Sequence, residues 1–152
     1  MENSFSIPFF DIPSGKNPKW EIIGENRRQI LILLDYPSEK TQDDFLEKIF
    51  SALEIHTTTD VMRLHSNAPE AIHFQELNKN GNFKQVVSFG VPFADLGLRF
   101  RYQAYQPIFV GNQGFLFVDS LPVIHAQRIR GIKEKSLLLW NALKQLFNHS
   151  QG

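Results

Sequence analysis

The sequence contains no cysteine among its 152 residues. This absence excludes disulfide bonds, thiolate zinc sites and a cysteine nucleophile. Long apolar runs are also missing, since the longest, such as residues 30–34, are far too short to span a bilayer. The N-terminus lacks the basic start and the long apolar stretch of a signal peptide. We therefore expect a soluble, cytoplasmic protein without membrane contact.

The formal net charge is zero, because 16 Lys and Arg residues balance 16 Asp and Glu residues. The two halves differ, however. Residues 1–75 hold 7 basic and 12 acidic residues, whereas residues 76–152 hold 9 basic and 4 acidic ones. A protein that grips duplex DNA normally carries a strong basic excess, which displaces counterions from the phosphates. The balance therefore predicts only weak or indirect contact with nucleic acid.

Apolar material is plentiful, with 42% hydrophobic residues and 14 Phe in a length that suits one domain. Residues 1–25 are the least regular part, because Pro8, Pro13 and Pro18 break any long helix or strand. We predict an irregular N-terminal arm over residues 1–25 and a single α/β domain over residues 26–152. The arm either packs across its own domain or binds a protein partner. Its candidate partner-binding side chains are Phe5, Phe9, Phe10 and Trp20.

The spacing of apolar residues predicts strands that alternate with helices. Residues 29–34 form a continuous apolar run, which is typical of a parallel strand buried on both faces. A helix is predicted to start at Thr41, with Asp44 as its capping partner. The remaining predictions are strands over residues 60–64, 83–89 and 114–118, a short helix from Pro69 to about Leu77, a turn over residues 78–81 and a loop over residues 91–103. Together these elements indicate an α/β fold.

The C-terminal third holds two further predictions. Residues 106–118 fit either a β-hairpin around Gly111–Gly114 or a helix or loop that leads into the final strand. Residues 132–147 have the periodicity of an amphipathic helix. Its predicted inward-facing residues are Leu138, Leu139, Ala142, Leu143, Leu146 and Phe147.

The sequence carries no complete catalytic or cofactor-binding motif. None of the five histidines has the spacing of a helical zinc site, and no serine lies in a G-x-S-x-G elbow. The Gly111–Gly114 stretch lacks the Lys and the Ser or Thr that a phosphate-binding loop requires. We therefore predict no metal and no cofactor.

Asp35 is the first crevice candidate, because it ends the first buried strand, where open α/β sheets bind their ligands. A carboxylate there could act as a general base, although an aspartate just before Pro37 also suits a turn or a helix cap. Ser120 follows the last strand and could approach Asp35 across the same crevice. Tyr36 and Phe89 could supply a ring on which a flipped base stacks.

Two stretches resemble the loop motifs of the uracil-DNA glycosylase fold. Asp35-Tyr36-Pro37 is a scrambled form of the first motif, and residues 119–122 (Asp-Ser-Leu-Pro) resemble the second but lack its initial His. The Ser-Leu-Pro stretch, the basic segment after it and residues 135–144 resemble the C-terminal end of the psi subunits of bacterial DNA polymerase III. Those subunits have a glycosylase-like fold without glycosylase chemistry. The resemblance implies a three-layer sandwich with a mostly parallel central sheet.

The resemblance also implies a function, namely a non-catalytic interaction subunit with protein partners, clamp-loader components among them. In the psi family an N-terminal extension docks on the clamp loader, and residues 1–25 would be the analogous tether. Two alternatives stay open. One is a divergent glycosylase that acts on nucleobases through Asp35. The other is a small-molecule hydrolase or binding domain of the doubly wound type.

Overall fold

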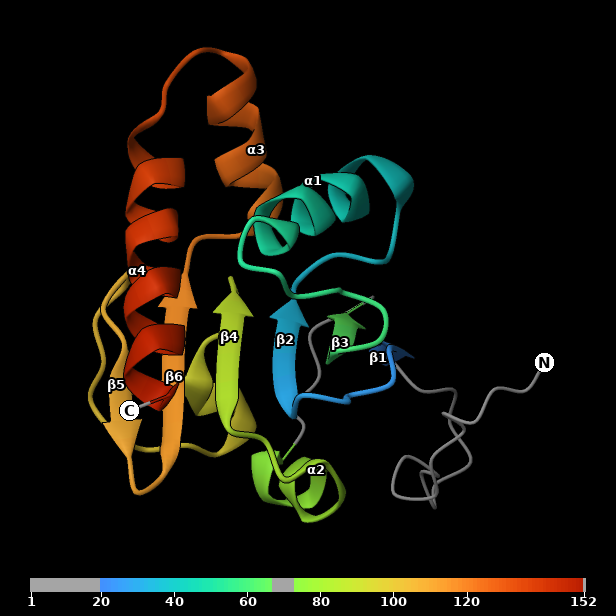
Figure 1. Ribbon diagram of the computed structural model, residues 1–152, viewed down its shortest axis with the longest axis vertical. Coiled ribbons are helices and arrows are strands. Elements are labelled where there is room, and N and C mark those ends of the chain that lie inside the picture. Colours follow the sequence, from blue (N-terminus) through green and yellow to red (C-terminus); the bar gives the residue numbers. More distant parts are fainter. Residues whose placement is uncertain (1–19, 67–72, 152) are drawn as a thin grey trace, which may run out of the picture.

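The computed structural model describes residues 20–66 and 73–151, which form a six-stranded sheet in the order β1-β3-β2-β4-β6-β5 (Figure 1). The strands are β1 (Trp20–Ile23), β2 (Ile30–Leu34), β3 (Val61–Ser66), β4 (Gln85–Phe89), β5 (Ile108–Val110) and β6 (Gln113–Val118). The helices are α1 (Lys40–Ser51), α2 (Phe74–Gly81), the 3-10 helix η2 (Phe93–Leu96), α3 (Leu121–Ile129) and α4 (Glu134–Gln151).

The four inner strands are parallel, whereas the edge strands β1 and β5 run antiparallel to their neighbours. The predicted α/β fold with a mostly parallel sheet is thereby confirmed. All residues of β2 and β4 are buried, as expected for strands with neighbours on both sides and cover on both faces. Their alternating side chains divide the core into two halves, one on each face of the sheet.

We call one face of the sheet the helical face, because α1, α3 and α4 cover it (Figure 1). Here Ile32 and Val87 of the sheet meet the apolar stripes of the three helices. The buried helix residues include Leu46, Phe50, Leu121, Ile124, Leu139 and Leu143.

We call the opposite face the aromatic face. α2, η2 and the irregular segment over residues 98–102 cover it, and Leu31, Leu33 and Val86 line it from the sheet. Phe93 of η2 is completely buried at its centre, with ring centroids 4.9–6.2 Å from four other rings. Those rings belong to Phe100, Tyr102, Phe115 and Phe117.

Several helix boundaries differ from the sequence-based predictions. α1 begins one residue before Thr41, and the cap is Glu39, whose carboxylate accepts hydrogen bonds from the backbone N–H groups of Thr41 and Gln42 at 3.1 Å. Asp44 therefore has no capping role there, and pairs with Lys40 instead. The turn predicted over residues 78–81 is wrong, because α2 continues to Gly81 and the left-handed turn falls on Asn82 (φ 49°). The predicted helix start at Pro69 lies outside the described residues.

Further differences concern the two ends of the chain. Residues 20–23 of the predicted arm form β1, while Phe5, Phe9 and Phe10 lie outside the described residues and Trp20 is the first residue of β1. The β-hairpin is the correct alternative for residues 106–118, since β5 and β6 pair across a two-residue turn. α3 was not predicted at all. Leu138 is 42% exposed, so its predicted inward orientation is wrong.

Candidate functional site

The connections that follow the neighbouring strands β2 and β4 leave toward opposite faces of the sheet. The chain leaves β2 toward α1 on the helical face, and leaves β4 toward η2 on the aromatic face. Adjacent parallel strands whose connections depart to opposite faces create a topological switch point, where doubly wound sheets bind their ligands. The residues that follow these strands are therefore the first to consider as a site.

Asp35 and Ser120 meet at this edge of the sheet. Asp35 follows β2, Ser120 follows β6 by two residues, and the Ser120 hydroxyl donates a hydrogen bond to Asp35 Oδ1 at 2.8 Å. Gly90 lies between them after β4 with φ +88°. A Cβ atom on Gly90 would lie 2.3 Å from Asp35 Oδ2 and 3.2 Å from Ser120 Cα, so only glycine permits this approach.

The environment of Asp35 defines what its carboxylate does. The Asp35 side chain is exposed, but partial desolvation of its carboxylate raises the pKa of Asp35, and the hydrogen bond from Ser120 partly offsets that effect. Ser120 is the N-cap residue of α3, so the Asp35 carboxylate lies at the positive end of that helix. The contact therefore fastens the start of α3 to the end of β2. A serine nucleophile is most often activated by a histidine. His125 instead stacks on Phe45, with ring centroids 4.2 Å apart.

The other two crevice candidates do not join Asp35 and Ser120. Tyr36 is only 7% exposed, and its hydroxyl donates to Asp43 Oδ1 at 3.2 Å. Phe89 is completely buried in the core of the helical face. Neither ring has an open face on which a flipped base could stack.

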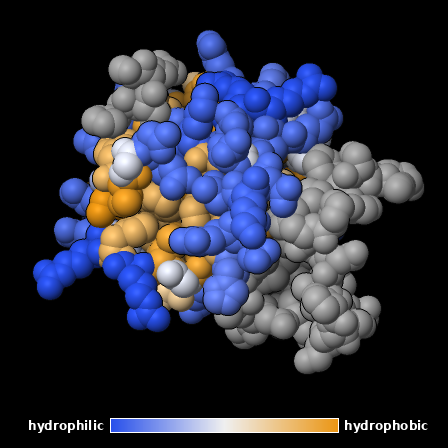
Figure 2. Space-filling model, turned by 90° about the horizontal axis from the view of Figure 1, so that it is seen from below, coloured by the Kyte–Doolittle hydropathy of each residue, from blue (hydrophilic) through white to orange (hydrophobic). Residues whose placement is uncertain are grey.

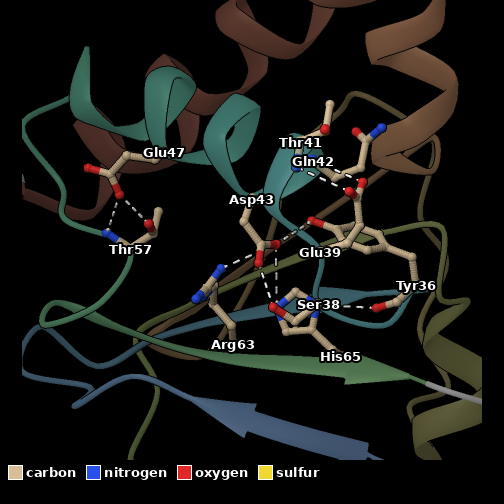
Figure 3. Close-up of polar contacts among 10 residues, drawn as sticks. All are labelled: Tyr36, Ser38, Glu39, Thr41, Gln42, Asp43, Glu47, Thr57, Arg63 and His65. Carbon is tan, nitrogen blue, oxygen red and sulfur yellow. Dashed lines mark hydrogen bonds and ion pairs between the residues drawn. The ribbon is translucent and has the colours of Figure 1, made fainter.

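A buried polar cluster lies beneath α1 (Figure 3). The Asp43 carboxylate accepts hydrogen bonds from the hydroxyls of Tyr36 and Ser38, and Arg63 Nη1 lies 3.5 Å from Asp43 Oδ1. Figure 3 shows the side chains of Arg63 and His65 pointing from β3 toward Asp43. Sequence reasoning missed this cluster, although two polar residues at positions i and i+2 of a buried strand share one face and need polar partners.

His65 is completely buried within this cluster. Its Nδ1 lies 3.2 Å from the carbonyl oxygen of Tyr36, and its Nε2 lies 4.0 Å from Asp43 Oδ1. Burial lowers the pKa of His65, the charge of Arg63 lowers it further, and the charge of Asp43 opposes both effects. A neutral ring that donates from Nδ1 to the Tyr36 carbonyl is a structural element that joins β3 to the loop between β2 and α1. We therefore assign the cluster to the core.

The helical face has a groove of about 570 Å³ between α1, α3 and α4, which we call the α1/α3/α4 groove. Apolar side chains dominate its lining. They are Phe45 and Ile49 of α1, Ile129 of α3, and Leu137, Leu139 and Trp140 of α4. Ile129 is 72% exposed and Leu137 is 60% exposed, which is unusual for two large apolar side chains lining one groove.

The groove also has a one-sided charge. Lys48, Arg128 and Lys133 contribute to its lining, and no described Asp or Glu does. The sequence contained one signal for the groove, namely three consecutive leucines at residues 137–139. A single helical stripe cannot bury three adjacent residues, so at least one must face away from the core.

A second hollow lies at the opposite end of the molecule, beside α2, where Figure 2 shows hydrophobic side chains gathered among hydrophilic ones. Phe74, Phe100 and Val110 line it together with polar side chains. Two of those polar groups already bond within the chain, since Gln113 Nε2 donates to Asn78 Oδ1 at 3.2 Å. The α1/α3/α4 groove is the more apolar of the two features.

Neither a family model nor a curated protein matches this chain. Its function therefore has to be argued from the geometry. Within residues 20–66 and 73–151, His, Asp and Glu side chains do not gather in threes as a metal site would need. The helices in these same ranges also lack the combined length and apolarity of a membrane span.

Proposed function

We propose that the chain is a non-catalytic interaction subunit that binds a protein partner through the α1/α3/α4 groove. The observation that carries the proposal is the exposure of Ile129 and Leu137 on the walls of one apolar groove. Large apolar side chains that line a common hollow lose their contact with water when a partner covers them, and this is favourable.

The geometry of the sheet edge supports a role without catalysis. A base-flipping enzyme stacks its target on an exposed ring, but Tyr36 and Phe89 are buried. A hydrolase would need a free acid or base in an open crevice, whereas the Asp35 carboxylate accepts a hydrogen bond from the hydroxyl of Ser120, the N-cap residue of α3. We therefore favour interaction over the glycosylase and hydrolase alternatives.

The proposal includes a uracil-DNA glycosylase-like form of the fold and a psi-like place in a replication assembly of the cytoplasm. The two loops that resemble glycosylase motifs meet through Asp35 and Ser120, which supports the first point. Clamp-loader components are the proposed partners, and DNA contact is weak or indirect. Phe5, Phe9 and Phe10 of the arm are a second proposed contact with the same assembly.

Co-elution of the full chain in gel filtration with the clamp-loader complex purified from the same organism tests the proposal. We expect the wild-type chain to co-elute and Leu137→Asp to elute alone, because the carboxylate would be buried in an apolar contact. Val110→Asp is the matched control, since Val110 is another exposed apolar residue at the opposite end, and it should co-elute.

Two results would contradict the proposal. The first is the same elution for Leu137→Asp as for wild type. The second is release of uracil from DNA by the wild-type chain that disappears in Asp35→Asn, since that result would reinstate the glycosylase alternative.

A further inference from the structure

We infer that the occupant of the α1/α3/α4 groove is a helix from the partner protein, with an apolar face and an acidic polar face. This inference deepens the proposed function and rests on it. The walls of the groove restrict both the backbone conformation and the charge of a segment that can bind there.

The backbone conformation follows from the walls. α1, α3 and α4 line the groove with side chains, and most of the backbone groups behind them are bonded within the helices or in the turn between α3 and α4. An extended segment in this groove would find few backbone donors or acceptors, and each of its own backbone groups that is buried unpaired would cost about 1–3 kcal/mol. A helix satisfies its own backbone, so it can bury an apolar face between the walls at no such cost.

The preferred charge of the occupant follows from the basic side chains that line the groove. Three exposed cations line the groove together with its apolar side chains, namely Lys48 of α1, Arg128 of α3 and Lys133 before α4. Within residues 20–66 and 73–151 none of these three cations forms an ion pair, whereas Lys135 is bonded to Asp119 at 2.8 Å. Three unpaired cations around one groove favour a partner with carboxylates beside its apolar face.

Other occupants fit less well. Residues 1–19 of the same chain contain Pro8, Pro13 and Pro18, which are incompatible with one continuous helix. A second copy would have to offer an acidic helix, but α1 is itself a wall of the groove and α4 carries the exposed Lys144. A nucleic acid would match the cations but not the apolar side chains of the groove.

A display experiment with the full chain tests the inference. The probe is a library of helix-forming peptides about 16 residues long, some four turns, with leucines along one face and either Glu or Lys at each remaining position. We expect selection to enrich Glu over Lys. The best acidic peptide should bind the triple variant Lys48→Glu, Arg128→Glu, Lys133→Glu at least about tenfold more weakly.

The matched control reverses three exposed cations away from the groove, Lys79→Glu, Lys84→Glu and Arg99→Glu, and should leave peptide affinity unchanged. A proline in the middle of the selected peptide should abolish binding, because it breaks the helix. Enrichment of Lys, insensitivity to that proline, displacement of the peptide by single-stranded DNA, or a dimer of the chain that blocks the groove would each overturn the inference.

The two failures can be told apart. If Leu137→Asp abolishes binding to the clamp-loader complex but selection favours neutral or basic peptides, the proposed function stands and the helix inference is wrong. If Leu137→Asp affects neither partner binding nor peptide binding, both are wrong.

Discussion

The two faces of the sheet treat their apolar side chains in different ways. On the aromatic face, Phe93 is completely buried and touches rings on every side, so the apolar material serves the core. On the helical face, α1, α3 and α4 bury one stripe each and still leave Ile129 and Leu137 largely exposed. The hollow beside α2 on the first face is lined by polar and apolar side chains alike, whereas the α1/α3/α4 groove on the second is mostly apolar.

This difference indicates where function and stability reside. A residue that is fully buried on the aromatic face should affect the free energy of unfolding and nothing else. A residue that lines the α1/α3/α4 groove should affect partner binding with little change in the free energy of unfolding. Each prediction below tests that separation, beginning with the largest expected effect.

Phe93→Ala should lower the free energy of unfolding by about 3–5 kcal/mol, because it leaves a cavity among four rings. Urea unfolding followed by circular dichroism measures the change. Leu137→Ala is the comparison on the other face, and should lower the same quantity by less than about 0.5 kcal/mol because its side chain is already 60% exposed. Similar losses in the two variants would contradict the distinction between the faces.

Asp43→Ala should lower the free energy of unfolding by about 3 kcal/mol. The Arg63 side chain is 8% exposed and would lose its carboxylate partner inside the protein. The double variant Asp43→Leu, Arg63→Met should be more stable than Asp43→Ala in the same urea titration, because it removes both charges together. A stable Asp43→Ala protein would show that the buried cluster does not hold α1 on β3.

Ser88→Ala should lower the free energy of unfolding by about 1–3 kcal/mol. The buried Ser88 hydroxyl donates to the carbonyl oxygen of Val91 and accepts the Val91 N–H at 3.0 Å, so alanine leaves two buried groups unpaired. Ser120→Ala is the control, since its hydroxyl bonds the exposed Asp35 and water can replace it. Equal losses of free energy of unfolding in the two alanine variants would mean that the Asp35–Ser120 hydrogen bond stabilises the fold as much as the hydrogen bonds between Ser88 and Val91.

Part of the sheet could be predicted because β2 is uniformly apolar. The run over residues 29–34 needs cover on both faces, and β2 has it. In β4 the residue types do not show which positions are open, because the polar Gln85 and Ser88 are buried together with Phe89. α3 was missed because Pro122 near its start suggested a break, although proline is well tolerated in a first helical turn.

The site could be predicted only in part, for a related reason. The rule that ligand crevices lie at strand ends brought Asp35 and Ser120 together correctly, because it depends on topology alone. The groove depends on the angles between three helices and on a helix that was not predicted. Its one local signal, the three leucines at residues 137–139, identifies an exposed apolar side chain but not the walls around it.

The smallest expected effect is a difference in pH dependence between Asp35 and Asp119, two aspartates that follow parallel strands at the same edge of the sheet. Partial desolvation raises the pKa of Asp35. Desolvation acts in the same direction on Asp119, but hydrogen bonds from Lys135 at 2.8 Å and Tyr105 at 2.7 Å outweigh it and lower the pKa of Asp119. The two carboxylates should therefore influence stability in opposite directions.

The sign follows from comparing each pKa with its unfolded value of about 3.9. The contribution of Asp35 is fully present below that pH and is lost as pH rises through its raised folded pKa. The contribution of Asp119 is present above that pH and is lost as pH falls through its lowered folded pKa. Urea midpoints from about pH 3 to about pH 7 should fall less toward neutral pH in Asp35→Asn, and less toward acid pH in Asp119→Asn, than in wild type. If the urea midpoints of the two variants depended on pH in the same way, the two carboxylates would have pKa values shifted in the same direction, and this prediction would be wrong.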